Sequence, residues 1–306
     1  MSIRIIFLGT AGAIPTAQRS LPAVLLQRGN EQLMFDCGEA VQRQMIRAKT
    51  GFHKKLKIFL THMHGDHVLG LPGLLQTMAL MDRQKPVEVY GPVGTAHFLA
   101  CLQESLQFGL TYPVEIHEVT NAGLVCNEEE YTITAEHTNH GVTSFAYAFV
   151  EKPRPGKFHP EKAKALGIRQ GQAWSQLQHG ETLTLKDGKT VKPEDVSGPQ
   201  RKGRKIVYTG DTRPFKAFAE FAADADLVIH EATFDDALIE KAELDGHSTP
   251  SQAAEEAKSA GAKSLVLTHI SARYSEPQLL LGQAKKVFAN TQVAEDFLEL
   301  ELPLGE

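Results

Sequence analysis

Short apolar runs separated by polar turns recur through the first 150 residues of this chain, and they predict β-strands. The first begins at Ile3 with Ile-Arg-Ile-Ile-Phe-Leu and runs into a glycine-rich turn, Gly9-Thr10-Ala11-Gly12. Similar runs predict strands over residues 21–27, 32–36, 57–60, 87–90, 114–119, 131–135 and 145–150. Helical spacing of apolar residues predicts three helices in this half, one after residues 36–39, one over 71–81 and one over 95–106.

The first predicted helix begins after Asp36-Cys37-Gly38-Glu39, and we expect this segment to cap it. Its buried face is predicted from three apolar residues at helical spacing, Val41, Met45 and Ile46. The helix over 71–81 is apolar along most of its length, so it either packs on its own sheet or meets a partner.

The second half of the chain repeats this order of strands followed by helices. Strands are predicted over residues 205–208, 227–230 and 264–268, and helices around residues 235–244, 250–260 and 277–289. A last segment, 293–302, closes the chain. Strands interleaved with helices in both halves predict a layered α/β architecture and allow a weak internal duplication.

Residues 151–204 differ from both halves, because they are rich in Pro, Gly and Lys and predict one helix, over 160–166. Counted to Lys205, the segment has 13 Lys and Arg against 6 Asp and Glu, a charge of +7. Since the whole chain carries −5, the remainder carries −12. Positive charge concentrated on an acidic protein is typical of a contact with a polyanion, although a basic insertion that only solubilises has the same composition. We therefore predict one domain over 1–306 into which 151–204 is inserted.

The remaining composition limits the class of protein. With 42% hydrophobic residues, a chain of 306 residues can bury a sizeable core. Its first residues do not resemble an export signal, and no apolar run approaches the ~20 residues of a membrane span. Cys37, Cys101 and Cys126 lack the spacing of a metal knuckle or a disulfide frame, and we expect them to be buried thiols in a reducing compartment. We therefore expect a cytoplasmic protein with no membrane contact.

Potential metal ligands concentrate in residues 61–67, Thr-His-Met-His-Gly-Asp-His, directly after a predicted buried strand. His62 and His64 are two residues apart, so on extended backbone their side chains point to the same side. Asp66 and His67 follow a glycine, where the turning chain can direct them back. Three imidazoles and a carboxylate are too many for one closed site, so we expect two divalent ions, with zinc the leading choice. A histidine-rich surface loop is the alternative, and the buried strand before it disfavours that reading.

Further ligands are expected at the ends of other strands, because loops at one edge of a sheet meet there. His140, Asp211 and His269 each follow a predicted strand. Asp211 lies in the tight turn Thr-Gly-Asp-Thr, from which one carboxylate can bridge two ions. His269 alone could equally be a structural histidine, but the three residues together favour a shared site.

These ligands together resemble those of the metallo-β-lactamase superfamily, and within it the short-form tRNA 3′-endonucleases known as ribonuclease Z. The segments that favour this branch extend almost to the C-terminus: Phe35-Asp36-Cys37-Gly38-Glu39, Gly210-Asp211-Thr212-Arg213, His230-Glu231-Ala232-Thr233-Phe234, Gly246-His247-Ser248-Thr249 and Ser271-Ala272-Arg273-Tyr274. The metal motif alone is typical of the whole superfamily, whereas the set is specific to the branch.

The resemblance implies a four-layer αβ/βα metallo-β-lactamase sandwich and a zinc-dependent endoribonuclease. Its substrate would be precursor tRNA, from which it removes the 3′ trailer, leaving a 3′-hydroxyl on the tRNA and a 5′-phosphate on the trailer. Two Zn²⁺ ions per subunit are implied, with ligands assigned by position: His62, His64 and His140 for one ion, Asp66, His67 and His269 for the other, and Asp211 for both.

The resemblance also implies catalytic roles. The two ions make a hydroxide available at neutral pH, and Asp66 accepts the proton of the water. His247 stabilises charge or protonates the leaving 3′-oxygen. Capping of a helix is the alternative role for His247, and Glu231 is expected to orient a histidine of the site.

Residues 151–204 would form a protruding arm that clamps the tRNA elbow. The turn Gly167-Ile168-Arg169-Gln170-Gly171-Gln172 departs from the family's Gly-Ile-Pro-x-Gly-Pro, and loss of both prolines is expected to loosen it. The resemblance further implies a homodimer, for which the 71–81 helix would offer four residues to the partner: Leu74, Leu75, Met78 and Met81.

Other activities share the metal motif. A glyoxalase-type thioesterase fits the ligands alone, but it gives no reason for the basic segment or for His247. The mRNA-end nucleases insert a large domain between the last Asp and the last His, and the 58 residues from Asp211 to His269 leave no room for one. A non-catalytic RNA-binding subunit would be expected to have lost ligands, and none of the seven is missing.

Overall fold

The computed structural model describes residues 2–304, which fall into two compact units. The first unit is formed by residues 2–150 and 205–304, and the second by Glu151–Arg204. The second unit is inserted in the chain between two paired antiparallel strands, β10 (Phe145–Glu151) and β13 (Lys205–Tyr208). No helix within residues 2–304 combines the length and the apolar composition that crossing a membrane requires.

Seven strands form the first sheet of the larger unit, in the order β18-β1-β3-β4-β5-β6-β7. Their bounds are β1 Ile3–Gly9, β3 Ala23–Arg28, β4 Glu31–Phe35, β5 Lys55–Phe59, β6 Val87–Pro92, β7 Val114–Val119 and β18 Glu299–Leu302. Strands β4 to β7 are parallel. The segments that leave their carboxyl ends therefore emerge at one edge of the sheet.

Seven strands also form the second sheet, in the order β17-β15-β14-β13-β10-β9-β8. The bounds of its other strands are β8 Gly123–Asn127, β9 Tyr131–His137, β14 Leu227–Glu231, β15 Leu265–Thr268 and β17 Thr291–Val293. Strands β13, β14, β15 and β17 are parallel to one another. A short parallel pair, β2 (Ala11–Gly12) with β16 (Ile270–Ser271), joins the loops after β1 and β15.

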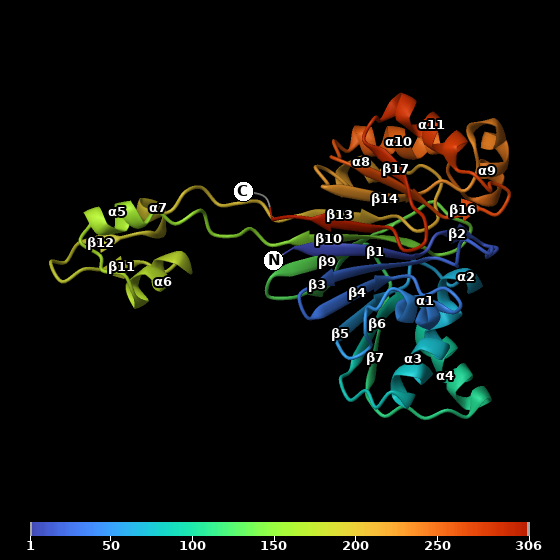
Figure 1. The fold of residues 1–306 in the computed structure, drawn as a ribbon, viewed down its shortest axis with the longest axis horizontal. Coiled ribbons are helices and arrows are strands. Elements are labelled where there is room, and N and C mark those ends of the chain that lie inside the picture. The colour runs from blue at the N-terminus through green and yellow to red at the C-terminus, as the bar shows by residue number, and fades with distance from the viewer. Residues whose placement is uncertain (1, 305–306) are drawn as a thin grey trace. The chain divides into compact units, whose positions relative to one another are not determined.

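The two sheets face each other across an aromatic and aliphatic core that includes Phe35, Phe59, Tyr147 and Tyr208. Helices α1 (Val41–Arg47), α3 (Gly70–Leu80) and α4 (Thr95–Leu106) cover the outer face of the first sheet (Figure 1). Helices α8 (Phe218–Phe221), α10 (Pro250–Ser259) and α11 (Gln278–Val287) cover that of the second. The other helices of this unit are short: α2 Gly65–Val68, η1 Asp236–Leu238 and α9 Ile239–Asp245. The predicted four-layer αβ/βα sandwich is confirmed.

Helix α1 differs from its prediction in two respects. Ile46, expected on the buried face, is 59% exposed. The N-cap residue is Ala40, in the left-handed region at φ 63°, and no side chain caps the helix. Asp36 cannot cap it because its buried carboxylate instead accepts hydrogen bonds from Thr61 and His67.

The apolar face of α3 is buried within the chain. Leu74, Leu75 and Met78 pack against the sheet. They are therefore not available to a partner, and the alternative, that the helix packs on its own sheet, is correct for these three residues. Met81 and its neighbour Leu80 are exposed at the end of the helix.

Three smaller expectations also need correction. Cys37 and Cys126 are buried thiols, but Cys101 is exposed on α4. The segment over 293–302 is not one element, because its ends pair in different sheets as β17 and β18. Strand β8 was not predicted because most of its side chains are exposed, which leaves no apolar alternation to detect.

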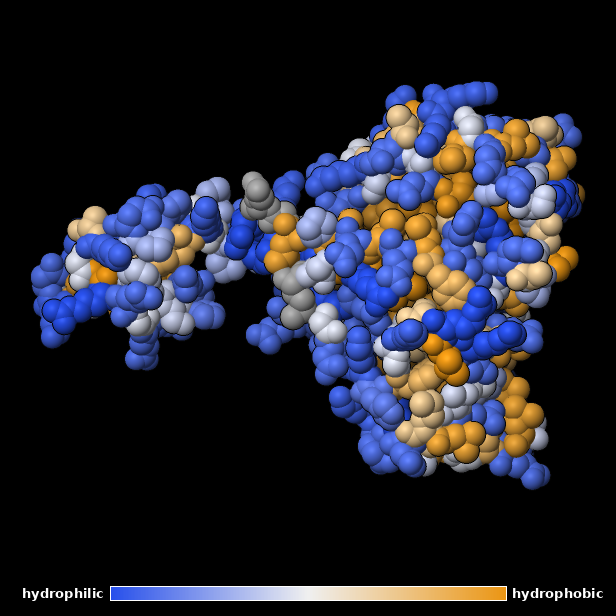
Figure 2. Space-filling view, in the orientation of Figure 1, coloured by the Kyte–Doolittle hydropathy of each residue, from blue (hydrophilic) through white to orange (hydrophobic). Residues whose placement is uncertain are grey.

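The second unit has more structure than the single predicted helix. It contains α5 Pro160–Ala165, α6 Gln172–Gln178 and α7 Pro193–Val196, with a short hairpin of β11 Leu183–Thr184 and β12 Thr190–Val191. These elements enclose a small core of Ala163, Ile168, Leu177, Val191 and Val196. Hydrophilic residues cover most of the visible face of this unit (Figure 2).

The turn that lacks the family's prolines is held by packing instead. Ile168 is 4% exposed in the small core, and the indole Nε1–H of Trp174 donates to its carbonyl at 3.0 Å. At the ends of the unit, the guanidinium of Arg204 donates two hydrogen bonds to the buried carboxylate of Glu151, each 2.7 Å long.

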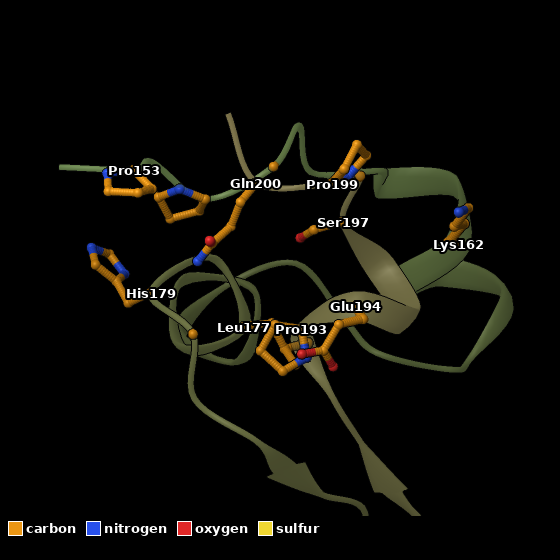
Figure 3. A pocket seen from close by; sticks show the side chains of 13 residues that line it. Pro153, Lys162, Leu177, His179, Pro193, Glu194, Ser197, Pro199 and Gln200 are labelled. Atoms are coloured by element: carbon orange, nitrogen blue, oxygen red, sulfur yellow. The ribbon is translucent and has the colours of Figure 1, made fainter. Parts of the chain in front are cut away.

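A cavity of about 680 Å³ lies within the second unit. Figure 3 shows its lining, which includes Pro153, Leu177, His179, Pro193 and Pro199. No predicted metal ligand or catalytic residue lines this cavity, so it is separate from the site described next.

Candidate metal centre

All seven predicted metal ligands come together at one edge of the first unit. His62 and His64 lie in the loop after β5, and Asp66 and His67 lie in α2. The other three follow the strands of the second sheet: His140 after β9, Asp211 after β13 and His269 after β15. Their potential ligand atoms lie within 4.8 Å of one another in groups that include His62–His64–His140 and Asp66–His67–His269, and Asp211 belongs to two further groups.

The first group consists of three imidazoles beside Asp211. The Nε2 atom of His62 is 3.0 Å from Nδ1 of His64, which is 3.3 Å from Nε2 of His140. The Oδ2 atom of Asp211 is 3.8 Å from Nε2 of His62. Three ring nitrogens converge here. If all of them carried protons, N–H donors would face one another, whereas one cation could bind all three unprotonated nitrogens.

The second group surrounds the other side of Asp211. The Oδ2 atom of Asp66 is 3.4 Å from Nε2 of His67 and 3.5 Å from Nε2 of His269. The carboxylate of Asp211 reaches both histidines, with Oδ2 3.4 Å from His67 Nε2 and Oδ1 3.3 Å from His269 Nε2. His67 Nε2, His269 Nε2 and Asp211 Oδ1 are buried without a hydrogen-bond partner. Buried polar atoms are almost always satisfied, so this donor set fits a bound cation.

Two buried carboxylates each orient one histidine by binding the ring nitrogen that faces away from the centre. Asp36 Oδ2 accepts a hydrogen bond from Nδ1 of His67 at 2.7 Å, and Glu231 Oε1 accepts one from Nδ1 of His247 at 2.8 Å. Each carboxylate also accepts the hydroxyl proton of a threonine, Thr61 or Thr233.

The same threonine oxygens lie next to a second histidine. Thr61 Oγ1 is 3.0 Å from Nδ1 of His62, and Thr233 Oγ1 is 2.8 Å from Nδ1 of His269. Because each hydroxyl gives its proton to a carboxylate, it can only accept from the ring. The Nδ1 atoms therefore carry the protons, and the Nε2 atoms are left unprotonated toward the centre, as metal binding requires.

Asp36 is the functional residue that sequence reasoning placed wrongly. It is fully buried at φ 58°, and its carboxylate also accepts hydrogen bonds from the Thr61 backbone N–H and the Tyr208 hydroxyl, each at 2.8 Å. A detectable signal was its position at the end of a strand whose neighbour leads into the metal motif. Left-handed backbone outside glycine is strained, and such strain persists where the surroundings enforce it.

Close backbone approaches complete the site. His269 itself has φ 57°. The carbonyl of Gly246 accepts a hydrogen bond from Nδ1 of His140 at 2.8 Å. Gly246 has φ 87°, and a Cβ there would lie 2.7 Å from that same nitrogen, so a side chain would displace the histidine.

His247 faces the centre from the side of the second sheet, and its ring centroid is 5.4 Å from those of His140 and His269. Burial alone would lower the pKa of His247, but Glu231 raises it to about 9. Glu231 therefore favours the protonated form of His247. The alternative role of helix capping belongs to Thr249, whose side chain accepts from the backbone N–H of Gln252.

The carboxylates of the centre are held ionised. Burial would raise the pKa of Asp66, but the adjacent His269 and His67 bring it well below its usual range. The pKa of Asp211 is lowered against the same effect of burial by His269 and His67. The backbone N–H of Ala13 also donates to Oδ2 of Asp66 at 3.1 Å. This is the charge state of a cation-binding site.

Two family models match parts of the chain, one described as Anti-Pycsar protein Apyc1 over residues 3–150 and one as Beta-lactamase superfamily domain over residues 171–270. A ribonuclease Z from Methanosarcina acetivorans is 47% identical over 302 residues, which cover 98% of each chain. The chain belongs to the ribonuclease Z family. The family predicted from the sequence is thereby confirmed.

Solved structures agree with this assignment. The human short form of tRNase Z is 31% identical, with a TM-score of 0.74 over 98% of this chain and 99% of the human one. The metallo-β-lactamase fold protein YhfI from Bacillus subtilis is 21% identical, with a TM-score of 0.68 over 98% of this chain and all of the other, and it supports the fold alone. A ribonuclease Z is an endoribonuclease, so the reaction at this site is hydrolysis of an RNA phosphodiester bond. With its cluster of histidines and aspartates, the enzyme is metal-dependent.

Proposed function

We propose that this member of the ribonuclease Z family removes the 3′ trailer from precursor tRNA, leaving a 3′-hydroxyl on the tRNA and a 5′-phosphate on the trailer. The observation that carries the proposal is the pair of ligand groups with Asp211 close to both of them and His247 beside them. The relatives named ribonuclease Z, which match over the full chain, and the human tRNase Z support tRNA as the substrate. Incubation with a 3′-extended precursor tRNA and mapping of both product ends tests it, and ends that lie elsewhere would refute it.

The proposed metal is zinc, with two ions per subunit. Imidazole and carboxylate donors suit zinc, and the buried unpaired atoms of His67, His269 and Asp211 support a second ion beside the first. The proposed ligands are His62, His64 and His140 for one ion, Asp66, His67 and His269 for the other, and Asp211 for both. Bound zinc would supply a water of lowered pKa and stabilise charge on the phosphate.

The chain's own groups would then handle the protons. Asp66, ionised and fixed by the Ala13 backbone, is placed to accept the proton of the attacking water. Glu231 favours the protonated form of His247, which is therefore placed to give a proton to the leaving 3′-oxygen. Glu231 holds the Nδ1 proton of His247, which directs Nε2 toward the substrate.

A change of leaving group tests the role of His247. A nitrophenolate leaves without protonation, whereas a ribose 3′-oxygen does not. His247→Gln should therefore lower turnover of precursor tRNA by about 10²–10⁴-fold, the usual contribution of general acid catalysis, and lower turnover of bis(p-nitrophenyl) phosphate far less. Equal losses on both substrates would show that His247 is not the acid.

The second unit is proposed as an arm that binds tRNA. Residues Glu151–Arg204 carry 12 Lys and Arg against 6 Asp and Glu, as expected of a surface that neutralises phosphates. Such contacts position the RNA and take no part in bond breaking.

The stem of the arm offers a place to remove it. Arg154 and Arg201 exchange backbone hydrogen bonds of 2.9 and 3.0 Å as an antiparallel bridge. Replacement of residues 155–200 by a two-residue Asn-Gly turn should therefore close a hairpin there. Activity on bis(p-nitrophenyl) phosphate should persist, while KM for precursor tRNA should rise, because uniform binding has been removed.

A charge-only variant is the matched control for this deletion. Substitution by Gln of four exposed lysines of the arm, Lys162, Lys164, Lys186 and Lys189, keeps its small core. This variant should also raise KM and make the salt dependence of tRNA binding shallower. An unchanged KM in the deletion would refute a tRNA-binding arm, and loss of activity on both substrates would make the arm structural.

A homodimer is proposed as well. Leu80, Met81 and Leu106 are exposed by 86%, 44% and 55% at the ends of α3 and α4. Figure 2 also shows hydrophobic residues on the visible face of the first unit. Light scattering at micromolar concentration should give twice the mass of the chain. A monomeric mass would reject the dimer.

A further inference from the structure

Arg273 belongs to a segment of the family pattern, Ser271-Ala272-Arg273-Tyr274, that the metal centre does not explain. It is exposed in the loop after β16. Its guanidinium carbon lies 4.8 Å from the ring centroid of Phe234, and its Nε–H donates to the hydroxyl of Ser271 at 3.1 Å. Stacking and this hydrogen bond hold an exposed arginine in one orientation, which limits the entropy lost when it binds a ligand.

Arg273 connects to the metal centre through two ring contacts. Phe234 is 4% exposed, and its ring centroid is 5.8 Å from that of His247 at an interplanar angle of 67°. The ring of His247 is in turn 5.4 Å from that of the metal ligand candidate His269. Arg273 therefore lies at the edge of the site, on the side of His247.

The guanidinium of Arg273 is not neutralised by the protein. Within residues 2–304, no carboxylate forms an ion pair with it, and its Nη1 and Nη2 atoms donate no hydrogen bond. Arg213, the other arginine close to the site, has its donors occupied by the carbonyls of Glu243, Leu244 and Asn139. Lys241, which also lies over the Phe234 ring, is paired with Asp245. Arg273 thus offers two parallel N–H donors, the geometry that matches two oxygens of a phosphate.

We propose that Arg273 binds the phosphate of the substrate RNA one nucleotide to the 5′ side of the scissile bond. This rests on the proposed function, in which His247 faces the leaving 3′-oxygen of the retained tRNA, so the tRNA strand lies on the side of His247 and Arg273. Since successive phosphates are one nucleotide apart, anchoring one of them determines which bond reaches the metal centre. Arg273 is therefore a positioning residue that sets the cleavage register.

A purely structural role predicts something different. The arginine also shields the Phe234 ring, so its loss could act by exposing that ring next to His247. Arg273→Met keeps an apolar cover over the ring and removes the charge and the donors. Arg273→Lys keeps the charge but lacks the planar pair of donors, so it should recover part of the function only.

The test is a double-mutant cycle between the arginine and one phosphate. A precursor tRNA is made with a single uncharged methylphosphonate at the linkage 5′ to the scissile bond, and kcat/KM is compared with that of the unmodified RNA. For the wild-type enzyme, the neutral linkage should lower kcat/KM by about 10- to 100-fold, the range for hydrogen bonds to charged groups. Arg273→Met should show the same loss on unmodified RNA and no further loss on the modified RNA. Its unmodified-RNA products should include ends displaced by one nucleotide.

Lys285→Gln is the matched control, since it removes one exposed positive charge on α11, and it should leave the cycle as in the wild type. Losses that multiply in Arg273→Met, or cleavage that stays in register, would overturn the proposal. A lowered melting temperature with multiplied losses would assign Arg273 to the cover of Phe234 instead. Failure of the proposed function is distinguishable, because the wild-type enzyme would then not cut the unmodified precursor at its 3′ end, and both proposals would fall.

Discussion

Replacing Asp36 by Asn tests the idea that a buried carboxylate sets the proton positions of the metal centre. Oδ1 of Asp36 accepts from the Thr61 backbone N–H at 2.8 Å and from its hydroxyl at 2.9 Å. Oδ2 accepts from Nδ1 of His67 at 2.7 Å and from the Tyr208 hydroxyl at 2.8 Å. An asparagine has one accepting oxygen and one donating nitrogen, so it cannot serve all four donors.

The orientation of the new amide follows from which donors can adapt. Directed at Thr61, the NH₂ group would meet a backbone N–H that cannot turn away. Directed at His67 and Tyr208, it meets a hydroxyl that can rotate and an imidazole that can change tautomer. The second orientation therefore costs less, and it moves the proton of His67 from Nδ1 to Nε2, the nitrogen that faces Asp66 and Asp211.

The magnitude follows from the lost contacts. A hydrogen bond to a charged group contributes about 1.5–3 kcal/mol, so unfolding should become easier by about 2 kcal/mol. A protonated Nε2 cannot bind metal, and changes behind a metal ligand typically lower metal affinity by about 10- to 100-fold. Both effects act on the ion that His67 would hold, and the ion assigned to His62, His64 and His140 should be affected less.

Chelator competition measures metal affinity in the purified Asp36→Asn variant, and urea unfolding measures its stability. Tyr208→Phe is the matched control, because it removes one donor to the same oxygen while the bond from His67 remains. This control should lose about 1 kcal/mol of stability and keep its metal. An Asp36→Asn enzyme that is folded and binds both ions with wild-type affinity would refute the tautomer argument.

His64→Ala and Asp211→Ala should each lower the bound metal and abolish activity, and full metal content in both by elemental analysis would contradict the ligand assignment. The pKa of the buried His230 is raised. Burial alone would lower this pKa, but Glu256, 2.9 Å from Nε2 of His230, outweighs that effect. Its stabilising contribution is therefore complete below the unfolded pKa of about 6.5 and is lost as pH rises through the raised value. Urea midpoints measured across this range should fall with pH, and Glu256→Gln should flatten the fall; identical profiles would contradict it. Of the three thiols, Cys101 should react first with a disulfide reagent in the native enzyme, and equal rates for all three would show that the core opens readily.

Much of the architecture is determined by local sequence. Buried strands such as β5 and β13 are continuous apolar runs, so their positions follow from the residues themselves. The candidate metal ligands were predicted because they follow such strands, and parallel strands bring their carboxyl ends to one edge. Ligand chemistry and strand position together therefore predicted the site, and the family resemblance supplied the pairing of ligands.

Elements that depend on their surroundings were predicted less well. In the second unit, α5 corresponds to the helix predicted over 160–166. Helices α6 and α7 were missed, because they form around a small core and are too short for a periodic pattern. The exposure of Ile46 was unexpected, and the sequence left open whether Met78 packs on its own sheet or meets a partner. Apolar spacing shows that a helix has an apolar face but not what covers it. Asp36 suits a cap by its residue type, and only the fold shows that its carboxylate is already occupied.

The contacts that tune the chemistry were decided by tertiary structure alone. Asp36 meets Tyr208 across 172 positions of the chain, and Arg273 meets Phe234 across the ends of two strands. Such pairs cannot be predicted from spacing or periodicity, because the residues around one member of the pair contain no information about the other member. The sequence by itself determined which residues could bind metal and where the strands lie. The packing of two sheets determined which nitrogens of His67, His140 and His269 face the centre. Their other nitrogens contact Asp36, Gly246 and Thr233, which come from distant parts of the chain.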